Sequence, residues 1–160
     1  MNIQLIASKF NKRETIGDFN YMIKRDMELE NDPLTLYIYN DNTESYYSHA
    51  YKMGAGNAII RQYNQFNPKM QRPFSAGIPT GSLENGGFGE LNKEALQVIN
   101  SSIKLIEKII VAYSIKTVYY STNNECGLLG KSLFDVDDEV LLYITTKLKK
   151  LTSNPIMIVM

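Results

Sequence analysis

The sequence predicts an α/β fold in three layers, with helices on both faces of a mainly parallel or mixed sheet. Two observations lead to this prediction: segments rich in β-forming residues alternate with segments of helical periodicity, and one strand segment is apolar on both alternating faces. The 160 residues, with an apolar fraction of 44 %, suit one domain with its own core. We therefore expect a single α/β domain over residues 1–160, in which residues 1–32 are candidates for an N-terminal extension.

The first third of the chain contains one helix and one strand that can be assigned from pattern. Residues 1–10 fit a strand or a helix equally well. Apolar residues recur at helical spacing through Thr15–Glu30, and Asn31-Asp32-Pro33 ends that helix. Leu34–Tyr39 is a strand of β-forming residues, and because both of its faces are apolar or aromatic we expect it to be central and buried on both sides.

The second half of the chain contains two helices and two strands. A helix is expected over Asn92–Tyr113, with Asn92 positioned to cap its start. Lys116–Ser121 is the next strand, and Val136–Leu151 is a helix with acidic residues at its start and lysines at its end, as the helix dipole favours. Pro155–Met160 is a short apolar strand. This alternation predicts a mainly parallel sheet.

Composition excludes several classes of protein. The formal net charge is zero, which argues against a nucleic-acid partner. One cysteine and one histidine cannot build the usual zinc site, and we expect no metal and no cofactor. No apolar run approaches the length of a membrane helix, so we expect no membrane partner and a cytoplasmic location. The sequence leaves homo-oligomerisation open.

Short polar side chains follow two of the expected strands directly. Asn40 and Asp41 come after the first, and Ser121 and Asn123 lie at the end of the second. Ligands of open α/β sheets bind beyond the carboxyl ends of the strands, so these side chains are candidates to bind ribose hydroxyls or a base edge. Asp41 is the candidate general base if the protein is an enzyme; otherwise it ends a strand in a turn.

A glycine turn before a short helical segment is the first candidate phosphate loop. Gly54 and Gly56 would let backbone N–H groups approach an anion, and Asn57 would cap the helix or touch the ligand. Arg61 would reach a phosphate with its guanidinium. The alternative is a tight turn with Arg61 on a solvated face.

A second candidate loop spans residues 76–89. Seven of the ten glycines lie between Gly54 and Gly89, and long loops without regular structure are uncommon unless they are functional. Thr80 and Gly81 are the candidate ligand residues here, in a phosphate-facing or lid loop. The alternative is a long surface connection.

Five strings in the chain resemble an uncharacterised family of small proteins common in bacteriophage genomes. They are GAGNAIIRQYN, SAGIPTG, GGF, KTVYYS and LGKSLFDV, within residues 34–151. The resemblance implies an accessory protein of a phage that acts in the host bacterial cytoplasm, and it implies no particular activity.

The layout also resembles that of macrodomains, which bind ADP-ribose on an α/β/α sandwich. In the macrodomains a glycine-rich stretch precedes a helix, compared here with Gly54 to Arg61, and a later strand precedes a polar loop, compared here with Lys116 to Gly130. This chain lacks the run of consecutive glycines and the upstream Asn-Ala-Asn element. The likeness implies a macrodomain-like or Rossmann-like fold and a nucleotide ligand.

Three functions follow from these patterns. The leading hypothesis is a protein that binds and sequesters a nucleotide-derived small molecule, such as an ADP-ribose-type or cyclic nucleotide defence signal, without turning it over. The second is a macrodomain-like hydrolase acting on an ADP-ribose-type ligand, with Asp41 as its base. The third is an inhibitor that binds a host protein through an exposed apolar patch.

Overall fold

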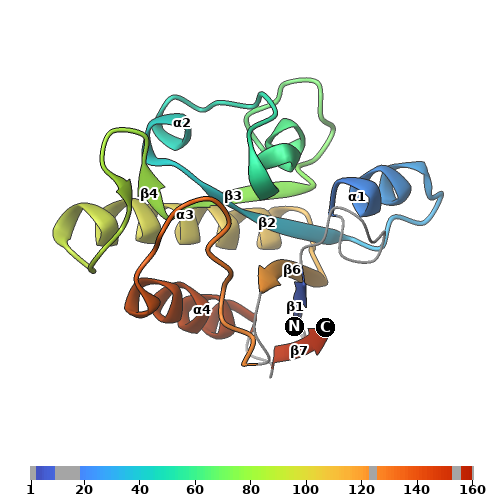
Figure 1. The fold of residues 1–160 in the computed structure, drawn as a ribbon. Coiled ribbons are helices and arrows are strands. Elements are labelled where there is room, and N and C mark those ends of the chain that lie inside the picture. Colours follow the sequence, from blue (N-terminus) through green and yellow to red (C-terminus); the bar gives the residue numbers. More distant parts are fainter. Residues whose placement is uncertain (1–2, 10–18, 123–125, 153–155, 160) are drawn as a thin grey trace.

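A five-stranded parallel sheet forms the centre of the molecule. The computed structural model describes residues 3–9, 19–122, 126–152 and 156–159, and within them the strand order is β3-β2-β6-β1-β7. The strands are β1 (Gln4–Lys9), β2 (Thr35–Asp41), β3 (Ser75–Pro79), β6 (Thr117–Thr122) and β7 (Ile156–Val159). Helices lie on both faces of the sheet (Figure 1), which confirms the predicted three-layer α/β class.

The two faces of the sheet are covered by different elements. Helices α3 (Lys93–Ala112) and α4 (Asp138–Thr152) pack together on one face. Helix α1 (Phe19–Glu28) and the 3₁₀ segment η1 (Gly56–Tyr63) pack on the other. Each face therefore has its own hydrophobic cluster, separated by the sheet.

Strand β2 separates these two clusters through the alternation of its side chains. Leu36 and Ile38 lie in the cluster under α3 and α4, whereas Tyr37 and Tyr39 lie in the cluster under α1 and η1. All seven residues of β2 are buried, and the strand lies between β3 and β6. The prediction that this strand is central and buried on both sides is confirmed.

The N-terminal segment supplies part of the sheet. Strand β1 pairs in parallel with β6 on one side and with β7 on the other. Residues 1–10, which fit a strand or a helix from their sequence, thus contain a central strand. Residues 1–32, considered above as an extension, contribute both β1 and α1 to the fold.

Two small elements extend from the carboxyl edge of the sheet. Helix α2 (Thr43–Tyr47) begins directly after β2, and its N-cap Asn42 accepts a hydrogen bond from Ser45 N at 2.8 Å. Strands β4 (Gly81–Ser82) and β5 (Gly86–Gly87) form a short antiparallel hairpin after β3. The sequence left the first of these segments unassigned and predicted a loop for the second.

The start of α3 follows the prediction closely. Asn92 is the N-cap, and its side chain accepts a hydrogen bond from Ala95 N at 2.8 Å. Such a cap stabilises a helix by about 1 kcal/mol.

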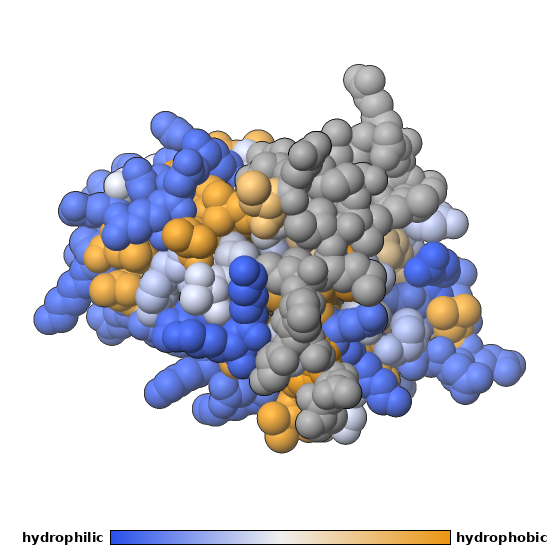
Figure 2. Space-filling model, turned by 90° about the horizontal axis from the view of Figure 1, so that it is seen from below, coloured by the Kyte–Doolittle hydropathy of each residue, from blue (hydrophilic) through white to orange (hydrophobic). Residues whose placement is uncertain are grey.

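The surface is mixed in character. In the face shown in Figure 2, hydrophilic residues cover much of the coloured surface and apolar residues form separate patches between them. Among the residues that the structure describes, no helix combines the length and apolar character needed to cross a bilayer.

Candidate functional site

Neighbouring strands β2 and β6 send the chain to opposite faces of the sheet. The segment after β2 leads to η1, and the segment after β6 leads to α4. In open α/β sheets this divergence opens a crevice at the carboxyl ends of the strands, where ligands bind. Asn40 and Asp41 lie at this end of β2, and Ser121 lies at this end of β6. Asn123, also predicted here, is outside the described residues.

Three of the predicted residues form a buried hydrogen-bonded network. Asn57 Oδ1 accepts from Asn40 N at 2.9 Å, and Asn57 Nδ2 donates to Asn40 Oδ1 and to Ser121 Oγ, both at 3.0 Å. Asn40 Nδ2 donates to Gly130 O at 2.7 Å. These bonds join β2, η1 and β6, which are far apart in the sequence. Most of the hydrogen-bonding capacity of the two amides is therefore used inside the protein.

Asp41 and Arg61 form a buried ion pair beside this network. Arg61 Nη2 donates to Asp41 Oδ1 at 2.6 Å, and the side chains are exposed to only 10 % and 3 % respectively. Burial raises the pKa of Asp41, and the Arg61 guanidinium opposes that rise. The Arg61 guanidinium, which was predicted to bind a phosphate, is thus paired with the Asp41 carboxylate. We call Asn40, Asp41, Asn57, Arg61 and Ser121 the edge cluster.

The two glycines of the first predicted loop make room for neighbouring side chains. A Cβ on Gly54 would lie 2.6 Å from Arg61 Nη1, so the glycine lets the guanidinium pass the backbone. Gly56 has a φ of +62°, and a Cβ there would lie 2.7 Å from Ser132 Oγ. Close packing within the protein therefore accounts for both glycines.

Thr80 and Gly81 connect the edge cluster to the hairpin. Thr80 N donates to Asp41 O at 3.1 Å, and Thr80 O accepts from Phe88 N at 2.9 Å. The Thr80 side chain is fully buried, and its Oγ1 has no hydrogen-bond partner among the described residues. Thr43 Oγ1 donates to Gly81 O at 3.0 Å, which ties α2 to the hairpin.

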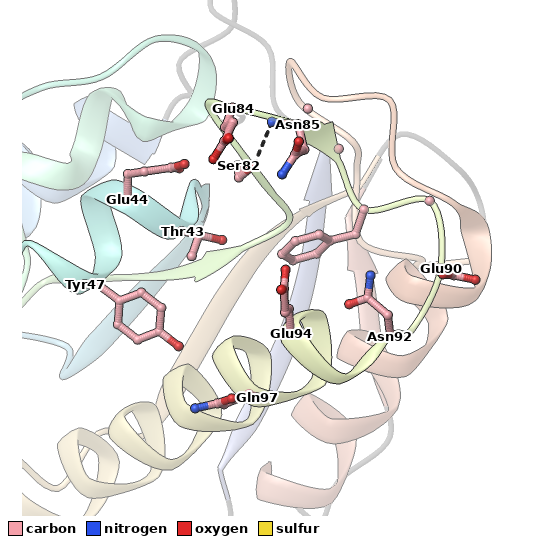
Figure 3. Close-up of a pocket in the computed structure, with 14 residues that line it drawn as sticks. Thr43, Glu44, Tyr47, Ser82, Glu84, Asn85, Glu90, Asn92, Glu94 and Gln97 are labelled. Atoms are coloured by element: carbon pink, nitrogen blue, oxygen red, sulfur yellow. Dashed lines mark hydrogen bonds between the residues drawn. The ribbon is translucent and has the colours of Figure 1, made fainter.

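A groove of about 890 Å³ opens between α2, the hairpin and the first turns of α3. Figure 3 shows Glu44 and Tyr47 reaching toward it from α2, Glu94 from α3, and Ser82 and Asn85 on the hairpin opposite. This volume lies within the usual range of small-molecule sites. The groove lies at the carboxyl ends of β2 and β3, because α2 and the hairpin directly follow those strands.

The groove is acidic. Four carboxylates line it, and none of its fourteen lining residues is Lys, Arg or His. Leu83 N donates to Glu44 Oε1 at 2.8 Å, and this hydrogen bond lowers the pKa of Glu44, so its carboxylate stays ionised at neutral pH. This charge disfavours a phosphate-facing role for segment 76–89. Among the described residues, no group of three or more His, Cys, Asp or Glu side chains is placed to hold a metal ion.

The predicted ligand residues do not line the groove, but the second predicted loop does, because Ser82, Glu84, Asn85 and residues 86–89 are among the lining residues. None of the nine predicted ligand residues that the structure describes borders it. The groove residues that sequence reasoning did not name as ligand residues include carboxylates, amides and an aromatic ring: Glu44, Glu84, Glu90, Glu94, Asn85, Asn92, Gln97 and Phe88. One signal could have found part of this set, since two of the four glutamates, Glu84 and Glu90, flank the glycines of the second predicted loop.

Comparison of the chain with protein-family models, curated proteins and solved structures finds no match.

Proposed function

We propose that this protein binds and sequesters a nucleotide-derived small molecule, and that the groove receives its nucleoside part. The observation that carries this proposal is the groove of about 890 Å³ at the carboxyl ends of parallel strands. Open α/β sheets bind ligands at this edge. Two hydrogen bonds support the proposal by fixing the walls of the groove: Thr43 Oγ1 donates to Gly81 O, which ties α2 to the hairpin, and Thr80 N donates to Asp41 O, which ties the start of the hairpin to β2.

The lining of the groove suits a base attached to a sugar. Tyr47 has 54 % of its surface exposed, and its ring offers a face on which a base can stack. Carboxylates such as Glu44 and Glu94 accept hydrogen bonds from ribose hydroxyls, as acidic residues do in dinucleotide-binding folds. Asn85 and Gln97 offer amide donors and acceptors for a base edge.

The position of Asp41 favours sequestration of the ligand over its turnover. The carboxylate expected to act as a general base is buried, is paired with Arg61 and does not border the groove. A base must come within hydrogen-bond reach of the proton it abstracts. The resemblance to phage proteins also supports a sink, since a phage gains from removing a host defence signal in the bacterial cytoplasm.

A hydrolase is the second candidate, and the four groove carboxylates favour it. Glycosidic bonds are cleaved by pairs of carboxylates, one acting as acid and the other as base or nucleophile. The groove places Glu44 and Glu94 around one space (Figure 3), so the catalytic groups would be glutamates and not Asp41.

A protein-binding role is supported by a different hollow. It has a volume of about 710 Å³, lies at the amino ends of β2 and β3, and includes Met27, Leu29 and Phe74 in its lining. Met27 and Leu29 are each 47 % exposed. Exposed apolar residues around a hollow are typical of interaction surfaces.

One experiment separates the three functions. The purified protein is mixed with a panel of nucleosides, cyclic nucleotides and ADP-ribose derivatives, free ligand is removed by filtration, and the retained fraction is heated and chromatographed. A compound depleted from the filtrate and released unchanged supports sequestration. A new product identifies the hydrolase. If every compound stays free and unchanged, the proposal is wrong and the protein-binding role takes its place.

A further inference from the structure

We propose that the groove takes a cationic nucleoside part of the ligand, with a positively charged ring base on a hydroxyl-bearing sugar, and that it disfavours a phosphate inside the groove, so that the phosphate of a nucleotide-derived ligand lies outside it. The inference rests on the proposed function, because it assigns the charge of the ligand that the groove takes. Its starting observation is the set of four carboxylates in a cavity without a lining cation: Glu44, Glu84, Glu90 and Glu94.

The aromatic lining acts in the same direction as the carboxylates. Tyr47 is 54 % exposed in the groove wall, and Phe88 is half-buried beside the hairpin. The face of an aromatic ring is electrically negative and attracts a cation within about 6 Å of its centre. A cationic base stacked on Tyr47 would gain from the ring and from the surrounding carboxylates together.

A helix start carries a positive potential that can attract phosphate, but residues at the start of α3 offset this potential. The side chain of Asn92 accepts from Ala95 N at 2.8 Å, so this helix-start donor is occupied. Glu94 adds a negative charge in the first turn, where it counters the helix dipole. The helix start therefore gives little attraction to a phosphate in the groove.

A second hollow that adjoins the groove is also mainly acidic. A smaller hollow of about 290 Å³ shares Gly89 with the groove and contains Lys131. That lysine lies 3.3 Å from the carboxylate of Asp135, and Asp137 and Asp138 line the same hollow. Lys131 is thus outnumbered by the three aspartates that line the same hollow.

Three ligands with an adenine ring system on ribose test the inference: 1-methyladenosine, whose N1 methyl group makes the base cationic at neutral pH, adenosine, which is neutral, and AMP, whose phosphate makes it anionic. Isothermal titration is done at low salt and at physiological salt. We expect 1-methyladenosine to bind at least about tenfold more tightly than AMP at low salt, with adenosine between them. Added salt should narrow the difference, because the four carboxylates are exposed to solvent.

Two isosteric variants assign the effect to the groove. Glu94→Gln should reduce the preference for 1-methyladenosine over AMP, whereas Glu107→Gln, an exposed position of the same helix outside the groove, should leave it unchanged. If adenosine binds and AMP binds as tightly as 1-methyladenosine, the charge inference is overturned while the proposed function stands. If none of the three ligands binds, the proposed function fails.

Discussion

Arg61 and Asp41 lie 20 positions apart in the chain and form an ion pair of 2.6 Å at the carboxyl end of β2. The pair connects η1 to the sheet, and the backbone oxygen of Asp41 also accepts a hydrogen bond from Thr80 N. The ion pair and this hydrogen bond therefore link three segments: η1, β2 and the residue that follows β3. The ion pair explains why an arginine follows a glycine turn here without being available to a phosphate.

Replacing Arg61 with Ala should destabilise the protein strongly. The variant leaves Asp41 as a buried carboxylate without its partner, and loss of one member of a buried pair costs about 3–5 kcal/mol. The free energy of unfolding in urea measures this. Lys131→Ala is the control, because its pair with Asp135 is exposed and should contribute less than about 1 kcal/mol. Equal losses in the two variants would contradict the account.

Two glycines of the second predicted loop should respond differently to Ala. A Cβ on Gly87 would lie 2.2 Å from the backbone oxygen of Asp135, whereas a Cβ on Gly89 would meet no atom within 4 Å. Gly87→Ala should lower the melting temperature, and Gly89→Ala should leave it unchanged or raise it slightly by restricting the unfolded chain. Thermal unfolding of both variants is the measurement, and an unchanged melting temperature for Gly87→Ala would contradict the close packing of the hairpin against Asp135.

Thr80→Val should stabilise the protein. The Thr80 hydroxyl is fully buried without a hydrogen-bond partner among the described residues, and an unsatisfied buried polar group costs about 1–3 kcal/mol. Valine keeps the shape of the side chain and removes this cost. Urea unfolding should show the gain, and ligand binding in the groove should not change. Loss of binding would instead restore Thr80 as a ligand residue.

Stability should fall at alkaline pH because of three buried tyrosines. Burial raises the pKa of Tyr37, Tyr39 and Tyr120 well above the ordinary value near 10. A group whose pKa is raised on folding contributes stability that is complete below its unfolded pKa and is lost as pH rises toward the folded pKa. Urea unfolding between about pH 8 and pH 11 should show a decline that begins near pH 10. A constant free energy of unfolding over this range would contradict the burial of these rings.

The layers of the fold could be predicted because they depend on local pattern. The apolar residues of β2 are enough to predict that both of its faces are buried, and Asn92 is enough to predict where α3 begins. Strand β1 could not be assigned, because its place between β6 and β7 depends on pairing partners more than 100 residues away. Tertiary context decides such short apolar segments.

Only part of the candidate site could be predicted, because the rest depends on tertiary contacts. Sequence position placed Asn40, Asp41 and Ser121 at the correct edge, since strand ends follow from the strands themselves. It could not show that Arg61 would be paired, because that contact depends on how η1 packs on the sheet. The groove residues come from α2, the hairpin and α3, and only the folded chain brings them together.

The most direct test of the central claim is an amide NMR titration of the ¹⁵N-labelled protein with adenosine. If the groove is the ligand site, amide signals within segments 43–47 and 82–97, which contain all of its lining residues, should shift with a single dissociation constant. Signals of the hollow at the amino ends of β2 and β3, such as those of Met27 and Phe74, should stay in place. Saturable shifts confined to that hollow, or no saturable shifts at all, would contradict the assignment of the groove as a nucleoside site.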